Sequence, residues 1–151
     1  MEEACIYYSK KKALNKMMFA LGIGFVGGYF LLTNNQSKGD DSTGFAVIFS
    51  LCLLFFVYKN YRRYRSAIPQ IILNKRELFT AQAGACKWEQ IQHEVVYEKQ
   101  FGKGKAYYLE YWHPAGPVSI RISDLDIEPM ELHMLLIEYR KQNQNIQSAG
   151  V

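Results

Sequence analysis

The stretch ALNKMMFALGIGFVGGYFLL, residues 13–32, is apolar apart from Asn15 and Lys16 near its start. At about 1.5 Å of rise per residue, a helix of this length measures roughly 30 Å, the thickness of a bilayer core. A long polar leader precedes the stretch and no small-x-small cleavage pattern follows it, which disfavours a removable signal peptide. The stretch therefore predicts a transmembrane helix over about residues 13–33.

A second apolar stretch covers residues 44–58 and has no charge between Phe45 and Val57. By length alone it fits a buried core helix as well as a membrane span. Tyr58, Tyr61 and Tyr64 can occupy the membrane interface, and the basic residues between them can reach the headgroups. The sequence therefore predicts a second helix over about residues 43–64, which makes residues 1–66 a two-helix transmembrane hairpin.

Basic residues flank this predicted hairpin on both outer sides, whereas residues 34–42 between the helices contain only Lys38. The excess of positive charge predicts that both termini are cytoplasmic and that the short loop is outside. The predicted membrane-interface residues are Lys10, Lys11, Lys12 and Lys16 before the hairpin and Lys59, Arg62, Arg63 and Arg65 after it.

Small residues recur at four-residue spacing in both predicted helices, a pattern that lets helix backbones approach closely in lipid. The predicted helix-packing residues are Ala20, Gly24, Gly28, Ala46 and Ser50. The pairing is either within one hairpin, which the short loop favours, or between two chains as a homo-oligomer.

The whole chain has 151 residues, of which 49% are hydrophobic and 21% charged. This composition excludes a disordered chain, a disulfide scaffold and a large enzyme. The basic excess lies in residues 1–66, so no basic domain face is available for a nucleic acid.

A domain boundary is predicted near Pro69, after which short β-type runs alternate with turn residues. A closing helix starts at Pro129 and carries an apolar stripe of Leu132, Leu135, Leu136 and Tyr139. Residues 67–143 are predicted to form a domain that folds without the membrane half, and residues 144–151 a polar tail. The six predicted strands cover residues 70–74, 77–82, 85–88, 91–100, 105–112 and 118–122.

The order of these features resembles a family of small bacterial inner-membrane proteins that carry a pleckstrin-homology-like (PH-like) domain behind two membrane helices. The resemblance is carried by YYSKKK at residues 7–12, the two apolar stretches, IPQIILN at 68–74, WEQI at 88–91 and IEPMEL at 127–132. It implies an α+β membrane protein whose bent, seven-stranded antiparallel β-barrel is closed by the C-terminal α-helix. Trp88 and Ile91 would be core residues. Because only six strands are clear in the sequence, either a seventh strand lies around residues 123–126 or the barrel is incomplete.

Residues for catalysis or metal binding are scattered. His93, His113 and His133 fall on different predicted elements without ligand spacing, and Cys5, Cys52 and Cys86 are widely separated. Cys86 with His93 as a base is an alternative, but an isolated strand cysteine is typically a small buried side chain. We predict no catalytic residues, no metal, no cofactor and no enzymatic activity.

The function expected from these features is a membrane-anchored interaction module that binds membrane lipids through the hairpin and a protein or peptide through the cytoplasmic domain. Alternation along residues 105–112 puts Tyr108 and Trp112 on one face of a strand, and with Phe101 they form the candidate binding surface. The alternatives are a sensor of anionic lipid surfaces and a membrane-associated immunity protein against a toxin.

Overall fold

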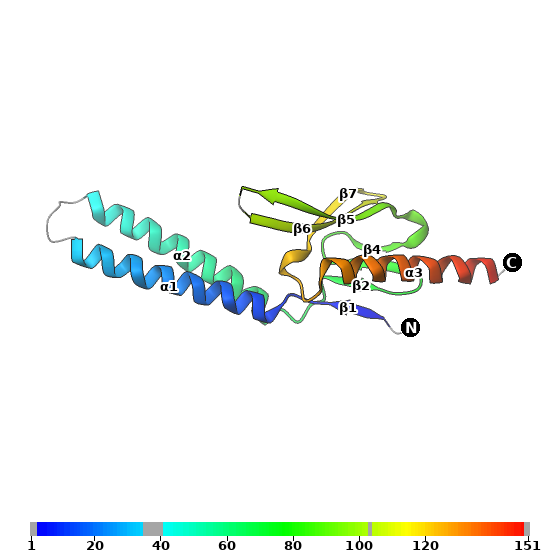
Figure 1. The fold of residues 1–151 in the computed structure, drawn as a ribbon, viewed down its shortest axis with the longest axis horizontal. Coiled ribbons are helices and arrows are strands. Elements are labelled where there is room, and N and C mark those ends of the chain that lie inside the picture. The colour runs from blue at the N-terminus through cyan, green and yellow to red at the C-terminus, as the bar shows by residue number, and fades with distance from the viewer. Residues whose placement is uncertain (1–2, 35–40, 103, 150–151) are drawn as a thin grey trace. The chain divides into compact units, whose positions relative to one another are not determined.

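The computed structural model describes residues 3–34, 41–102 and 104–149 (Figure 1). The chain divides into two compact units, and each is described by itself. Lys10–Ser66 form the helical unit. Met1–Ser9 and Ala67–Val151 together form the sheet unit, so the helical unit is an insertion in the sequence of the sheet unit.

The helical unit contains α1 (Lys10–Asn34) and α2 (Asp41–Arg65), which lie side by side (Figure 1). Glycine permits this close approach. A Cβ added at Gly24 would lie 3.2 Å from Leu53 Cδ1, and one at Gly27 would lie 3.2 Å from Phe49 Cε1. An added side-chain carbon at either position would make a tight contact that the Leu53 or Phe49 side chain would have to relieve by shifting.

The prediction of two membrane-spanning helices is wrong. Among the described residues, only one helix is long and apolar enough to cross a membrane, and the qualifying segment is the 21-residue Lys10–Phe30 of α1. In α2 the apolar run gives way to Lys59, Asn60 and Arg62, so its C-terminal part is a polar helix. The loop predicted at residues 34–42 falls mostly outside the described residues.

The sheet unit contains two open antiparallel sheets. The first has the order β1-β2-β3-β4 and the second the order β5-β6-β7. The strands are β1 (Ala4–Ile6), β2 (Ile71–Leu73), β3 (Glu77–Thr80), β4 (Gly84–Lys87), β5 (Gln92–Phe101), β6 (Gly104–His113) and β7 (Gly116–Arg121). The six predicted strands are thus present as β2 to β7, with shifted ends.

The predicted closed barrel is wrong, because no strand pairing joins the two sheets within the part of the chain that the structure describes. A short 3₁₀ turn, Trp88–Gln90, separates β4 from β5 and redirects the chain from one sheet to the other. The Trp88 indole nitrogen donates a hydrogen bond to the Asn74 carbonyl at 2.8 Å, which fixes this corner.

The seventh strand is not at residues 123–126, where a 3₁₀ turn (Ile122–Asp124) is found instead. It is β1, which precedes the helical unit in the sequence and pairs with β2, Ile6 opposite Ile71. Three residues before a Lys-rich helix carry too short a pattern to be read as a strand.

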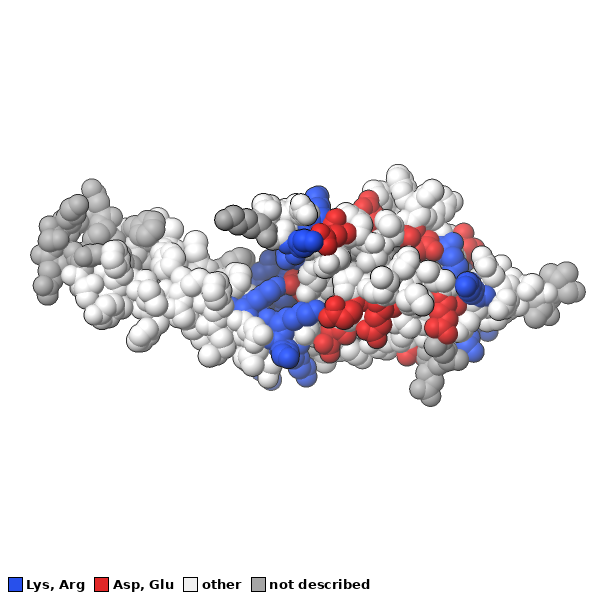
Figure 2. Space-filling model, in the orientation of Figure 1, with Lys and Arg blue, Asp and Glu red and all other residues white. Residues whose placement is uncertain are grey.

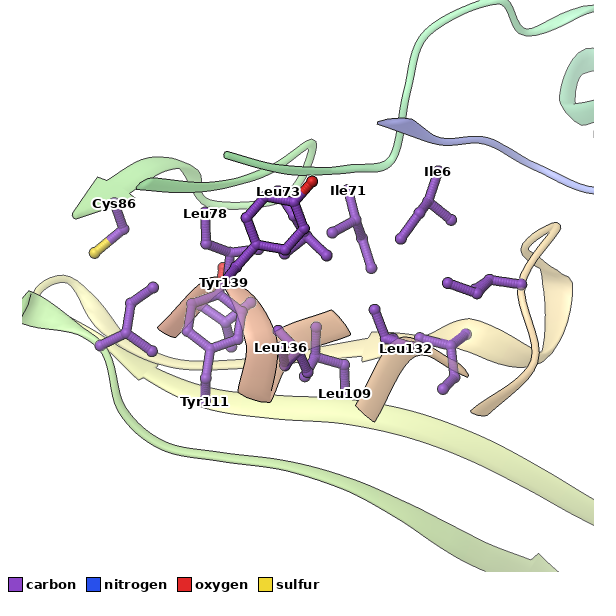
Figure 3. Packing of buried hydrophobic residues seen from close by; sticks show 14 of the residues in the cluster. Ile6, Ile71, Leu73, Leu78, Cys86, Leu109, Tyr111, Leu132, Leu136 and Tyr139 are labelled. Atoms are coloured by element: carbon purple, nitrogen blue, oxygen red, sulfur yellow. The ribbon is translucent and has the colours of Figure 1, made fainter. Parts of the chain in front are cut away.

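The core lies between the two sheets, and α3 (Pro129–Ala149) packs into it (Figure 3). Leu132, Leu136 and Tyr139 of α3 are buried against residues of both sheets, such as Leu73 and Leu109. Trp88 and Ile91 are also core residues, as the family resemblance implied. The apolar stripe of α3 therefore closes the open side of a two-sheet sandwich.

Residues 144–149, which were predicted to be part of a polar tail, continue α3 to Ala149. No proline or glycine interrupts residues 130–149, so helical hydrogen bonding can continue. Two contacts hold this part of the helix to the sheet unit. Asn143 Nδ2 donates to the Lys75 carbonyl at 3.1 Å, and Gln147 Nε2 donates to Glu89 Oε1 at 2.5 Å.

Candidate functional site: the helical anchor and the aromatic sheet face

The helical unit presents apolar side chains to its surroundings. Phe25 is 82% exposed and Phe19 71%, and many of the large apolar residues of α1 and α2 are exposed as well. Figure 2 shows a largely uncharged surface along these helices. Exposed apolar surface of this extent is typical of a membrane-contacting segment rather than of a water-exposed helix pair.

The eight predicted membrane-interface residues lie toward the N-terminal end of α1 and the C-terminal end of α2. Lys10, Lys11, Lys59, Arg62 and Arg65 are exposed, whereas Lys12, Lys16 and Arg63 are half-buried. The Arg65 guanidinium donates to the Tyr61 hydroxyl at 3.3 Å and lies 6.0 Å from the centroid of that ring. This contact orders one basic side chain at the end of the apolar surface.

The predicted helix-packing residues divide into two groups. Ala20 is buried and Gly24 lies against Leu53, so these two residues are at the contact between the helices. A Cβ at Gly28 would meet open space, and Ser50 is exposed with its hydroxyl on the Ala46 carbonyl at 2.8 Å. The contact uses Gly27 in place of Gly28, a one-residue shift that a four-residue pattern does not reveal.

The three candidate binding residues lie on one face of the β5-β6-β7 sheet. Tyr108 is paired with Tyr97 across the strands, and their rings are stacked with centroids 5.9 Å apart. The Phe101 ring lies 6.3 Å from that of Tyr108. Trp112, four residues farther along β6, shares this face and is 53% exposed. The neighbouring Leu109 and Tyr111 point into the core instead.

The face therefore contains two separate aromatic groups. The tip cluster consists of Tyr97, Tyr108 and Phe101, and Trp112 lies about 13 Å from Tyr108 at the usual rise of a strand. The pKa of the Tyr97 hydroxyl is raised, mainly by burial and secondly by its hydrogen bond with the Glu110 carboxylate.

A charged group lies near the turn on the opposite face of the hairpin from the tip cluster, because Glu98 pairs with Tyr107 and successive strand side chains alternate between faces. Lys105 Nζ is 2.9 Å from Glu98 Oε1, and the Tyr107 hydroxyl donates to Glu98 Oε2 at 2.9 Å. The hydrogen bonds from Lys105 and Tyr107 lower the pKa of Glu98. In turn, the hydrogen bonds with Glu98 raise the pKa values of Lys105 and Tyr107. The three side chains tie β5 to β6 near the turn.

The candidate Cys86–His93 pair gains no support from its surroundings. Cys86 is buried, and its thiol faces the Lys87 carbonyl at 3.7 Å and Gln90 Oε1 at 3.8 Å. Burial raises the pKa of the thiol, which is the opposite of what activates a cysteine nucleophile. No group of three metal-ligating side chains occurs among the described residues, and the His113 ring accepts a hydrogen bond from the Ala115 amide at 3.1 Å.

Two features of the sheet unit were missed at the level of sequence. Glu94 forms a two-point ion pair with Arg140 of α3, with Nε–Oε1 at 2.5 Å and Nη2–Oε2 at 2.6 Å. A register shift between Gln92 and Val95 and a positive φ of 54° at His93 orient this carboxylate. A positive φ is usually marked by a glycine in the sequence, and a histidine at this position does not predict a bulge.

The second missed feature is an open polar cavity of about 780 Å³ at the C-terminal end of α3. Its lining includes three basic residues, Lys75, Arg76 and Lys87, and three acidic residues, Glu3, Glu77 and Glu89. Because the basic and acidic residues of the lining are equal in number, the cavity favours neither an anionic nor a cationic ligand.

The chain was compared with protein-family models, curated proteins and solved structures, and none of the three comparisons gave a match. The resemblance to PH-like membrane proteins stays a prediction.

Proposed function

We propose that the chain is a membrane-anchored, non-enzymatic interaction module. The helical unit holds it in the inner membrane of a bacterium, and the sheet unit presents a binding surface at the cytoplasmic face. The observation that carries the proposal is the exposed apolar surface of α1, where the 21-residue segment Lys10–Phe30 is long enough to cross a bilayer.

Strand pairing supports the idea that both connections to the helical unit are on one side of the membrane. β1 and β2 are hydrogen-bonded neighbours, so Ser9 and Ala67 belong to one folded unit. A bilayer cannot pass between paired strands. Both connections to the helical unit are therefore at one face of the membrane, and α2, which packs against α1, has to return the chain to that face although it does not qualify as a membrane span by itself. The basic residues at both ends favour the cytoplasmic face.

The anchoring part is tested by extraction and labelling. After an alkaline wash of membranes, the chain should stay in the pellet. In a background with the three native cysteines replaced, a cysteine at Ser148 should resist an impermeant thiol reagent in intact cells. Release by the wash contradicts the membrane anchor, and labelling at Ser148 contradicts the orientation.

The binding part concerns Trp112, whose exposed indole offers a large contact area at low entropic cost. A photo-crosslinker at position 112 is expected to capture a protein partner in cells. The matched control is the same crosslinker at Met134, which is equally accessible but on α3. Equal capture profiles at the two positions would contradict a binding surface at Trp112.

A further inference from the structure

Both covalent connections to the helical unit leave from one end of the sheet unit. The Ser9 amide donates to the Asp124 carbonyl at 3.0 Å, and the Asp126 amide donates to the Tyr7 carbonyl at 2.9 Å. On the return, the Gln70 amide donates to the Ile6 carbonyl at 2.7 Å. We call this the exit end of the sheet unit, and it is defined by Ser9, Ala67 and Asp124.

The β5–β6 hairpin reaches the same end. Ser123, next to Asp124, accepts a hydrogen bond from the Tyr107 amide at 2.7 Å. Tyr107 is paired with Glu98, and Phe101 lies three residues closer to the turn, about 10 Å at the rise of a strand. Within the sheet unit, the turn of this hairpin and the C-terminal end of α3 lie at opposite ends (Figure 1).

The side chains near the turn combine an exposed aromatic ring with a lysine. Phe101 is 54% exposed and Lys99 Nζ lies 5.4 Å from its centroid. Lys105 is on the opposite face of the hairpin, where it is paired with Glu98. Tyr108 packs against the Phe101 ring, and Gly102 adopts the positive φ of 58° that the turn requires. Aromatic residues with adjacent lysines are typical of the boundary between headgroups and acyl chains.

We infer that this hairpin tip, made of Lys99, Phe101 and Tyr108, is a second contact with the membrane and binds an anionic lipid surface. Phe101 enters the headgroup region, and Lys99 lies against lipid phosphates. The inference rests on the proposed membrane anchor, because the exit end is next to the bilayer only if Lys10–Phe30 is inside it. The hairpin tip then fixes the orientation of the sheet unit at the surface.

Fluorescence of the full chain in vesicles tests this contact. The variant Phe101→Trp is made in a Trp112→Phe background, which retains buried Trp88 as a constant signal. The vesicles contain phosphatidylcholine with or without phosphatidylglycerol, and the acyl chains carry bromine near the glycerol. We expect blue-shifted emission and bromine quenching of Phe101→Trp, both stronger with phosphatidylglycerol.

The matched control is Ile146→Trp, because Ile146 is 50% exposed and lies about 25 Å along α3 from its start. Its emission should not respond to brominated lipid. Lys99→Ser should lower the ratio of docked to free hairpin tip about fivefold in anionic vesicles, as expected for one charge near such a surface.

Three results separate the alternatives. If Phe101→Trp is quenched by aqueous iodide as strongly as Ile146→Trp in both lipids, the hairpin tip is free and the inference is wrong. Shielding from both iodide and bromine would indicate a protein on the hairpin tip, which also overturns it. Loss of the chain from the vesicles in an alkaline wash would instead overturn the membrane anchor itself.

Discussion

Ile6 and Ile71 are direct antiparallel partners in one sheet, although the entire helical unit separates them in the sequence. Both side chains are buried in the core, which the Ile6 side chain helps to close at one edge. The pairing makes the helical unit a loop between the first two strands of the sheet unit. The sheet unit is therefore attached to the anchor by two connections instead of one.

Ile6→Ala is expected to destabilise the sheet unit by about 2–4 kcal/mol, because it removes buried methyl groups and leaves a cavity. Urea unfolding of the chain in detergent, followed by the fluorescence of buried Trp88, measures the change. Cys5→Ala is the control, since Cys5 is exposed on the same strand and should change stability by less than about 0.5 kcal/mol. Equal midpoints for the two variants would show that β1 does not contribute.

A fragment of residues 67–151 is expected to be less stable than the sheet unit of the full chain, because it lacks β1. Joining residues 1–9 to residue 67 through a short Gly/Ser linker should restore protection of the β2 amides from hydrogen exchange. A linked fragment with a scrambled order of residues 1–9 is the control. If 67–151 alone is equally protected, the fold does not need the first strand.

Arg140→Leu is expected to destabilise the sheet unit by about 1–3 kcal/mol, because Glu94 loses a charged partner in a partly buried site. The Arg140 guanidinium also donates to the Ile91 carbonyl at 3.0 Å, which adds to the loss. Thermal unfolding monitored by near-ultraviolet circular dichroism measures it, with exposed Glu131→Gln on the same helix as the control. An unchanged midpoint for Arg140→Leu would mean that the ion pair is not needed to hold α3.

His93→Gly tests the bulge that positions Glu94. Glycine adopts a positive φ without the steric cost that a side chain incurs, so this change should be neutral or stabilise the sheet unit by up to about 1 kcal/mol. His93→Val should be destabilising in the same measurement. If valine is tolerated as well as glycine, the backbone at residue 93 is not constrained to this conformation.

Glu98 is expected to titrate below the ordinary pKa of a glutamate, which is about 4.3, because Lys105 and Tyr107 donate hydrogen bonds to its charged form. The stabilising contribution of this carboxylate is present above the ordinary pKa and is lost as the pH falls through the lowered one. NMR of the Glu98 side-chain carboxyl measures the titration. Lys105→Ala should move its midpoint back up, and an unmoved midpoint would contradict the pairing.

Several elements of the fold could be predicted from the sequence alone. Strands β2 to β7 were predictable because each has a run of apolar alternation bounded by turn residues, and α3 because its apolar stripe repeats at helical spacing. The aromatic residues Tyr108 and Trp112 were placed on one face by the same alternation. Each of these patterns extends over a few neighbouring residues, so it can be recognised without knowing the tertiary structure.

The sequence by itself determined strands β2 to β7 and helix α3 of the sheet unit, the apolar segment of α1 and the basic residues around it, since composition and periodicity act over a few residues. Only the tertiary structure decided that Ala4–Ile6 completes the first sheet, that the sheets stay open, and that Glu94 meets Arg140. These depend on groups distant in the chain. Their pairing is decided by the burial and hydrogen bonding that become available only when the whole unit has folded.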